Sequence, residues 1–208
     1  MLLDTASLLD APAGGPAPCV AAPSGGWAPN GRRGRPVAVA GLAGSPSARS
    51  RSAALLRHAL AAVTGDPAAG PIHIAGLPQL ALVRADPSEP ELARALAQVV
   101  QAEWVLVATP IYKAAYSGVL KLFLDLLPPD ALRGKRVLPL ATGGSLAHLL
   151  AVDYSLRPVL GALGARDILD TVFATEAQFE PDEAGGWRPD AAVRERLARA
   201  LGGVTAAC

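Results

Sequence analysis

Five short apolar segments alternate with helix-like segments along most of this 208-residue chain. The expected strands cover residues 37–43, 72–74, 104–108, 136–140 and 168–174. The expected helices cover residues 50–63, 89–101, 117–127, 145–163 and 191–201, and Pro158 interrupts the fourth of them. Strands that alternate with helices at this spacing form βαβ units, so the sequence predicts an α/β fold with a parallel sheet.

Right-handed crossovers leave few ways to order five such strands. The doubly wound, flavodoxin-like order 2-1-3-4-5 fits the spacing best. In that order the carboxyl ends of the first and third strands flank a crevice where ligands bind. We therefore expect the chemistry of the chain directly after the first, third and fourth strands.

Residues 1–36 differ in composition from the rest, with six prolines and six glycines. Such a segment loses more entropy on ordering than burial returns, which predicts a flexible tail over 1–36 and one domain over 37–203. A docking arm for a partner subunit is the alternative. Both cysteines, Cys19 and Cys208, lie in the tails, so no disulfide framework is expected and a reducing cytoplasm is the default.

Charge and hydropathy exclude several classes of function. Nineteen Lys and Arg against eighteen Asp and Glu give a net charge of +1, which argues against a nucleic-acid binder. No apolar run reaches the roughly 18–20 residues of a membrane span, and no export signal begins the chain, so a cytoplasmic protein without a membrane anchor is expected. His58 and His73 have no neighbours at ligand spacing, so no metal site is predicted.

The segment from Gly44 to Ser52 joins the first expected strand to the first expected helix, and it holds four serines and two arginines. A helix N-terminus favours an anion, hydroxyls add donors, and arginine adds a charged fork. Because the segment matches neither a Walker loop nor GxGxxG, we predict a site for a terminal monophosphate. The residues predicted to hold it are Ser45, Ser50, Arg51 and Ser52. Plain helix capping by Ser47 or Ser50 is the alternative.

Two further loops follow the third and fourth strands. Thr109, Pro110, Ile111 and Tyr112 offer a rigid turn and a flat face, which suits an aromatic heterocycle. Backbone N–H groups of paired glycines can approach the edge of a planar ligand, and the residues predicted there are Thr142, Gly143, Gly144 and Ser145. Each loop alone could be an ordinary turn. Together with the phosphate site they fit flavin mononucleotide (FMN).

Three blocks of the sequence closely resemble the NADPH-dependent FMN reductases: residues 43–52, 107–121 and 138–154. Within that family the chain is most similar to the flavin-supplying component of two-component alkanesulfonate monooxygenase systems, over about residues 37–180. The resemblance implies a flavodoxin-like homo-oligomer, usually a tetramer. It also implies that NADPH or NADH reduces FMN, and that reduced FMN passes to a partner monooxygenase of sulfonate or sulfur metabolism. A tyrosine matching Tyr116 is implied in a π-type turn at the subunit interface, where it assists flavin release; simple packing is the alternative.

The resulting hypothesis is hydride transfer by positioning, in which no side chain acts as acid or base. Two rival functions stay open. A flavodoxin-fold quinone, azo-dye or chromate reductase would use the same loops but retain its FMN. A non-enzymatic electron carrier is disfavoured, because carriers dock their partners through a strongly acidic face and this chain is nearly neutral.

Overall fold

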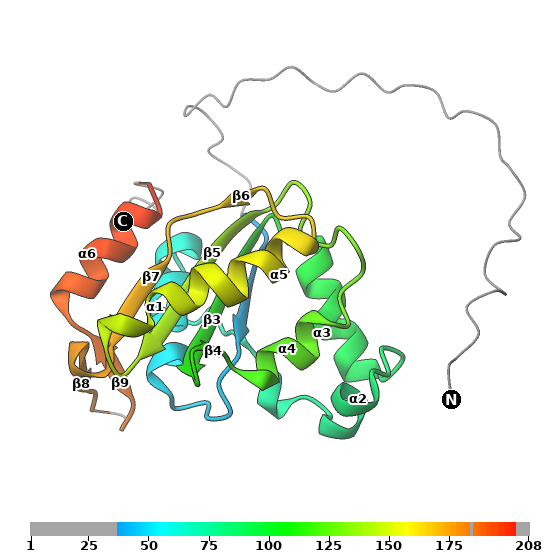
Figure 1. Ribbon diagram of the computed structural model, residues 1–208, viewed down its shortest axis with the longest axis horizontal. Helices are drawn as coiled ribbons and strands as arrows, with labels where there is room; N and C mark the ends of the chain where they lie inside the picture. Colours follow the sequence, from blue (N-terminus) through cyan, green and yellow to red (C-terminus); the bar gives the residue numbers. More distant parts are fainter. Residues whose placement is uncertain (1–36, 184, 203–208) are drawn as a thin grey trace, which may run out of the picture. The chain divides into compact units, whose positions relative to one another are not determined.

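The computed structural model describes residues 37–183 and 185–202 (Figure 1). The prediction of a tail over 1–36 and both cysteines lie outside the described residues. The sheet contains β1 (Val39–Ala43), β2 (Ile72–His73), β3 (Trp104–Tyr112), β5 (Arg136–Gly143), β6 (Asp167–Ile168) and β7 (Val172–Thr175). The helices are α1 (Arg51–Thr64), α2 (Gln79–Arg84), α3 (Pro90–Gln101), α4 (Gly118–Leu124), α5 (Arg157–Ala162) and α6 (Ala191–Ala200). Two hairpins complete the fold, through β4 (Ala115–Tyr116) on β3 and through β8 (Phe179–Pro181) with β9 (Trp187–Pro189).

The strands run in the order β2-β1-β3-β5-β6, and β7 also pairs with β5. All of these pairings are parallel. Because β4 is only a hairpin strand on β3, this is the predicted flavodoxin-like order with the fifth strand divided in two. The prediction of fold class is confirmed.

Helices cover both faces of the sheet, and the alternation of side chains along the strands decides which face each residue meets (Figure 1). Val105 and Val107 belong to the core under α2, α3, α4 and α5. Leu106 and Ala108 belong to the core under α1 and α6. A central strand buried on both faces reads as a continuous apolar run, as β3 does.

Two prolines explain where the strands depart from the prediction. The third strand does not stop at Thr109 and Pro110 but continues to Tyr112. Pro110 is tolerated there because the pairing of β1 with β3 ends at Ala108, so a missing N–H costs no ladder bond on that side. Pro139 lies in β5 between the residues that pair with β6 and those that pair with β7, and its missing N–H divides the expected strand 168–174.

Two expectations about helices were wrong. The predicted helix over 145–163 consists of a 3₁₀ turn (Leu146–His148), a π-helical turn (Val152–Leu156) and α5. Pro158 follows directly after the π-helical turn, and a widened turn of this kind accommodates a proline that cannot donate a backbone hydrogen bond. The expected loop after residue 74 contains a 3₁₀ turn (Ile74–Gly76) and α2.

The resemblance implied a π-type turn at Tyr116, and the structure does not show one there. Tyr116 lies in β4, which packs beside the π-helical turn Val152–Leu156. The described residues contain no helix long and apolar enough to span a membrane, and no group of side chains that could hold a metal ion.

Candidate functional site

A cavity of about 380 Å³ opens at the carboxyl edge of the sheet, within the size range of small-molecule sites. Of the residues predicted to bind a ligand, it is lined by Ser50, Arg51, Ser52, Pro110, Ile111, Tyr112, Thr142, Gly143 and Gly144. Ser47, Arg49, Glu176 and Trp187 complete the lining. The structure does not bring Ser45, Thr109 or Ser145 to this lining. A larger cavity of about 510 Å³ lies between β2 and α3 and contains none of the predicted residues.

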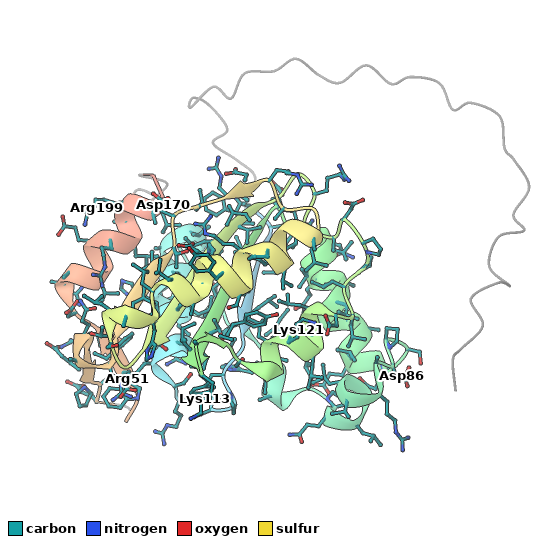
Figure 2. All side chains as sticks on the ribbon, viewed as in Figure 1. Arg51, Asp86, Lys113, Lys121, Asp170 and Arg199 are labelled. Carbon is teal, nitrogen blue, oxygen red and sulfur yellow. The ribbon has the colours of Figure 1, made fainter. Side chains whose placement is uncertain are left out.

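Arg51 and Lys113 both lie toward the edge where β4, β8 and β9 are found, whereas Asp170 and Arg199 lie toward the opposite edge (Figure 2). This agrees with the rule that ligands bind outside the carboxyl ends of parallel strands.

The N-terminus of α1 forms one wall of the cavity. Ser50 is the N-cap, and its Oγ accepts a hydrogen bond from the backbone N–H of Ala53 at 3.2 Å. The Oγ atoms of Ser50 and Ser52 are 3.1 Å apart. No acidic residue lies in the first turn, so the positive end of the helix dipole faces the cavity together with Arg51. The capping alternative is therefore correct for Ser50, and capping leaves the hydroxyl at the wall of the cavity.

Buried hydroxyl groups connect the loop after β1 to the β3–β4 hairpin. Ser117 Oγ donates to the carbonyl of Gly44 and accepts from the N–H of Leu120, so it also caps α4. The N–H of Ser117 donates to Thr109 Oγ1 at 3.0 Å, and that hydroxyl donates to the carbonyl of Pro110 at 3.0 Å. Thr109 and Ser117 are almost fully buried, so their hydroxyls hold the loops in place instead of facing the cavity.

Ser45 plays a comparable structural part. It is buried, and its Oγ accepts a hydrogen bond from the N–H of Ser47 at 3.2 Å, within the turn before α1. The serine that does reach the cavity from this turn is Ser47.

The β3–β4 hairpin presents an aromatic ring at the mouth of the cavity. Tyr112 lines the cavity and is 54% exposed as a residue. The turn that follows consists of Lys113 (φ 50°) and Ala114 (φ 60°), a left-handed conformation that side chains with a Cβ adopt at a cost. On the other side of this turn Tyr116 is half-buried, and burial raises the pKa of its phenol above the usual value of 10.0.

The end of β5 supplies Thr142, Gly143 and Gly144. A Cβ on Gly143 would lie 3.0 Å from Phe173 Cζ and 3.3 Å from His148 Nδ1, so only glycine fits there without movement of a neighbour. A Cβ on Gly144 would meet nothing within 4 Å, so this backbone is open to a ligand. The buried Nδ1 of His148 has no hydrogen-bond partner among the described residues.

Glu176 and Trp187 are lining residues that sequence reasoning missed. Glu176 follows β7, whose carboxyl end lies beside that of β5 through the pair Gly143 and Thr175. Strand order alone could have indicated Glu176, because the same edge gathers the ends of all parallel strands. Trp187 comes from the β8–β9 hairpin, and no local signal in the sequence places that hairpin over α1.

Comparison with known proteins identifies the family of the chain. Residues 37–180 match the family model described as NADPH-dependent FMN reductase. The chain belongs to this family. Membership makes the chain an oxidoreductase that acts on FMN with a reduced nicotinamide nucleotide. The predicted family, enzyme class and cofactors are therefore confirmed.

Three similar proteins illustrate the range of the family. "FMN reductase (NADPH)" of Escherichia coli K12 is 51% identical over 138 residues, which are 66% of this chain and 72% of that protein. "NADH-dependent FMN reductase SfnF" of Pseudomonas fluorescens Pf0-1 is 35% identical over 152 residues, 70% of this chain and 80% of that one. The apo crystal structure of the NADH:FMN oxidoreductase EMOB superimposes with a TM-score of 0.70 at 42% identity, covering 80% of this chain and 87% of that one.

Proposed function

We propose that this FMN reductase binds FMN in the cavity at the carboxyl edge of the sheet and releases reduced FMN to a separate flavin-dependent monooxygenase. The observation that carries the proposal is the lining of one cavity by three loops with complementary chemistry. These are the cationic helix N-terminus after β1, the tyrosine-bearing hairpin after β3 and the glycine turn after β5.

The residues present fit FMN. The phosphate is assigned to Ser50, Arg51 and Ser52, where helix dipole, hydroxyls and guanidinium all favour a dianion. The isoalloxazine ring is assigned to the space between the β3–β4 hairpin and the open backbone of Gly144, which a Cβ-free residue leaves accessible. Ser45 and Thr109 support these loops from behind through the hydrogen bonds described above.

FMN supplies the hydride-accepting chemistry when it is bound. The chain holds the flavin ring beside the reduced nicotinamide, and exclusion of water from the contact between two planar rings favours transfer. The backbone N–H of Gly144, which follows the end of β5, stabilises negative charge that develops at the ring edge. None of these steps requires a protein acid or base, and the charged lining residues Arg51 and Glu176 lie 3.4 Å from each other at the part of the cavity assigned to the phosphate.

The proposal also concerns the monooxygenase that receives the reduced flavin and the nicotinamide nucleotide that supplies the hydride. The resemblance of the sequence to the reductases of alkanesulfonate monooxygenase systems supports a monooxygenase of sulfur metabolism as the recipient. Relatives named for NADPH and for NADH both match this chain, so both nucleotides belong in the assay.

A homo-oligomer, with a tetramer as the expected size, is supported by the surface of the segment 146–156. Leu146, Leu150 and Tyr154 expose 65%, 58% and 80% of their surface in the single chain. Clusters of exposed apolar side chains commonly mark protein interfaces. Tyr116 lies in β4 beside this segment, which supports its predicted place near the interface and its part in flavin release.

Steady-state assays with FMN, FAD and riboflavin, each against NADPH and NADH, test the activity. Arg51→Ala should raise the Kd of FMN by about tenfold or more, because a charged hydrogen bond to the phosphate is lost. Turnover at saturating FMN should change little, because that bond is lost equally from the ground state and from the transition state. Arg84→Ala on α2 is the matched control and should bind FMN as the wild type does. An Arg51→Ala protein with wild-type FMN affinity would disprove the phosphate assignment.

Release is tested on the purified protein. A colourless protein that oxidises the nicotinamide only after FMN is added agrees with release. A yellow protein that keeps its flavin through dialysis would instead support the quinone, azo-dye or chromate reductases considered above.

A further inference from the structure

Arg51 is already engaged in the structure by two residues from distant segments. Its Nη1 lies 3.4 Å from Glu176 Oε2, and its Cζ lies 4.0 Å from the centre of the Trp187 ring. The Nε atom is buried without a hydrogen-bond partner among the described residues. The guanidinium assigned to the FMN phosphate is thus held by a carboxylate on one side and an indole face on the other.

We propose that Glu176 is a specificity-determining residue that keeps the affinity for FMN low, because its carboxylate competes with the FMN phosphate for Arg51. The inference rests on the proposed function, in which Arg51 binds that phosphate. The competition gives a physical reason why a site with several anion-binding groups would release its flavin after each turnover. Glu176 acts through Arg51 and does not take part in hydride transfer.

The competition follows from charge. A phosphate monoester carries a charge of about −1.5 to −2 at neutral pH. When it approaches Arg51, it must either displace Glu176 or share the guanidinium with a carboxylate of like charge. Glu176 can move aside, since its side chain is 60% exposed, so the pair reduces the affinity for FMN without closing the site.

Trp187 makes the competition effective. Its ring covers one face of the guanidinium, so Arg51 cannot swing into solvent without losing a cation–π contact. The hairpin that carries Trp187 packs against α1, the helix that begins with Arg51. Arg51 therefore stays within reach of both the carboxylate and an incoming phosphate.

The test compares two flavins that differ only in the phosphate. Titrations followed by flavin fluorescence give the Kd of FMN and of riboflavin for the wild type, for Glu176→Gln and for Glu176→Ala. Both variants should bind FMN about three- to tenfold more tightly and riboflavin within about twofold of the wild type. The gain for FMN should shrink as the salt concentration rises, because screening weakens the interaction between exposed charges.

Glu180→Gln is the matched control, since it removes one negative charge from the same hairpin region at a residue that does not line the cavity. It should leave both Kd values unchanged. The inference is overturned if Glu176→Gln binds FMN no more tightly than the wild type, if riboflavin gains equally, or if Glu180→Gln gives the same gain. A wild-type protein that binds no FMN would instead overturn the proposed function itself.

Discussion

Removal of the Ser117 hydroxyl should both destabilise the chain and weaken the binding of FMN at the proposed site. In Ser117→Ala, α4 loses its N-cap bond to Leu120, which costs about 1 kcal/mol. The carbonyl of Gly44 loses the buried hydroxyl that bonds to it, which costs about 1–3 kcal/mol. The two effects predict a loss of about 2–4 kcal/mol in the free energy of unfolding. For a domain of this size that lowers Tm by roughly 4–16 °C.

The measurement is thermal unfolding without flavin, followed by an FMN titration. The affinity for FMN should also fall, because Gly44 begins the turn that precedes α1 and the hydroxyl of Ser117 ties it to the β3–β4 hairpin. Ser88→Ala is the matched control: that serine is exposed, and its loss should change stability by less than about 0.5 kcal/mol. A Ser117→Ala protein that melts with the wild type would refute the assigned hydrogen-bond network.

Two further predictions concern stability. Gly44→Ala should cost about 1–3 kcal/mol in urea unfolding, because its Cβ would lie 2.8 Å from Leu120 Cβ and 3.1 Å from the Ala108 carbonyl oxygen. Gly118→Ala, whose Cβ meets nothing within 4 Å, should be neutral or stabilising, and equal losses would contradict this steric argument. Burial and then the charge of Arg194 lower the pKa of His58 below 6.5, so the unfolded chain binds a proton more readily than the folded one. The free energy of unfolding should therefore fall as the pH drops below about 6.5, and His58→Gln should flatten that dependence; an unchanged pH profile would contradict it.

The general position of the site could be predicted from the sequence because its signals are local. Buried parallel strands read as apolar runs, each ends at a turn, and right-handed crossovers bring the carboxyl ends to one edge. Arg51, Tyr112 and Gly144 could therefore be assigned to one cavity although they are far apart in the chain. The order of the strands alone predicts that these three residues lie close together, without knowledge of any side-chain contact.

The rest depends on contacts that no local pattern encodes. Trp187 lies in a two-stranded hairpin whose position over α1 is fixed by tertiary packing, so the local sequence does not predict the contact of its ring with Arg51. The division of the expected strand 168–174 into β6 and β7 follows from Pro139 on the neighbouring β5, and it can be predicted only when the register is known. The π-helical turn at Val152–Leu156 likewise gives no periodic signal of its own.

The length of β3 decides which of its polar residues can meet a ligand. If the strand stopped at Ala108, the residues from 109 to 112 would form a loop, and all of them would be equally good candidates. Because β3 continues to Tyr112, the period of two places Thr109 with Val107 on the side of α4, where it meets Ser117, and Pro110 with Ala108 on the side of α1. The same alternation places Tyr112 on the side of α1, where it lines the cavity, and the left-handed turn at Lys113 then reverses the chain. An extension of four residues thus separates the Thr109 hydroxyl, which supports the loops, from Pro110 and Tyr112, which line the cavity.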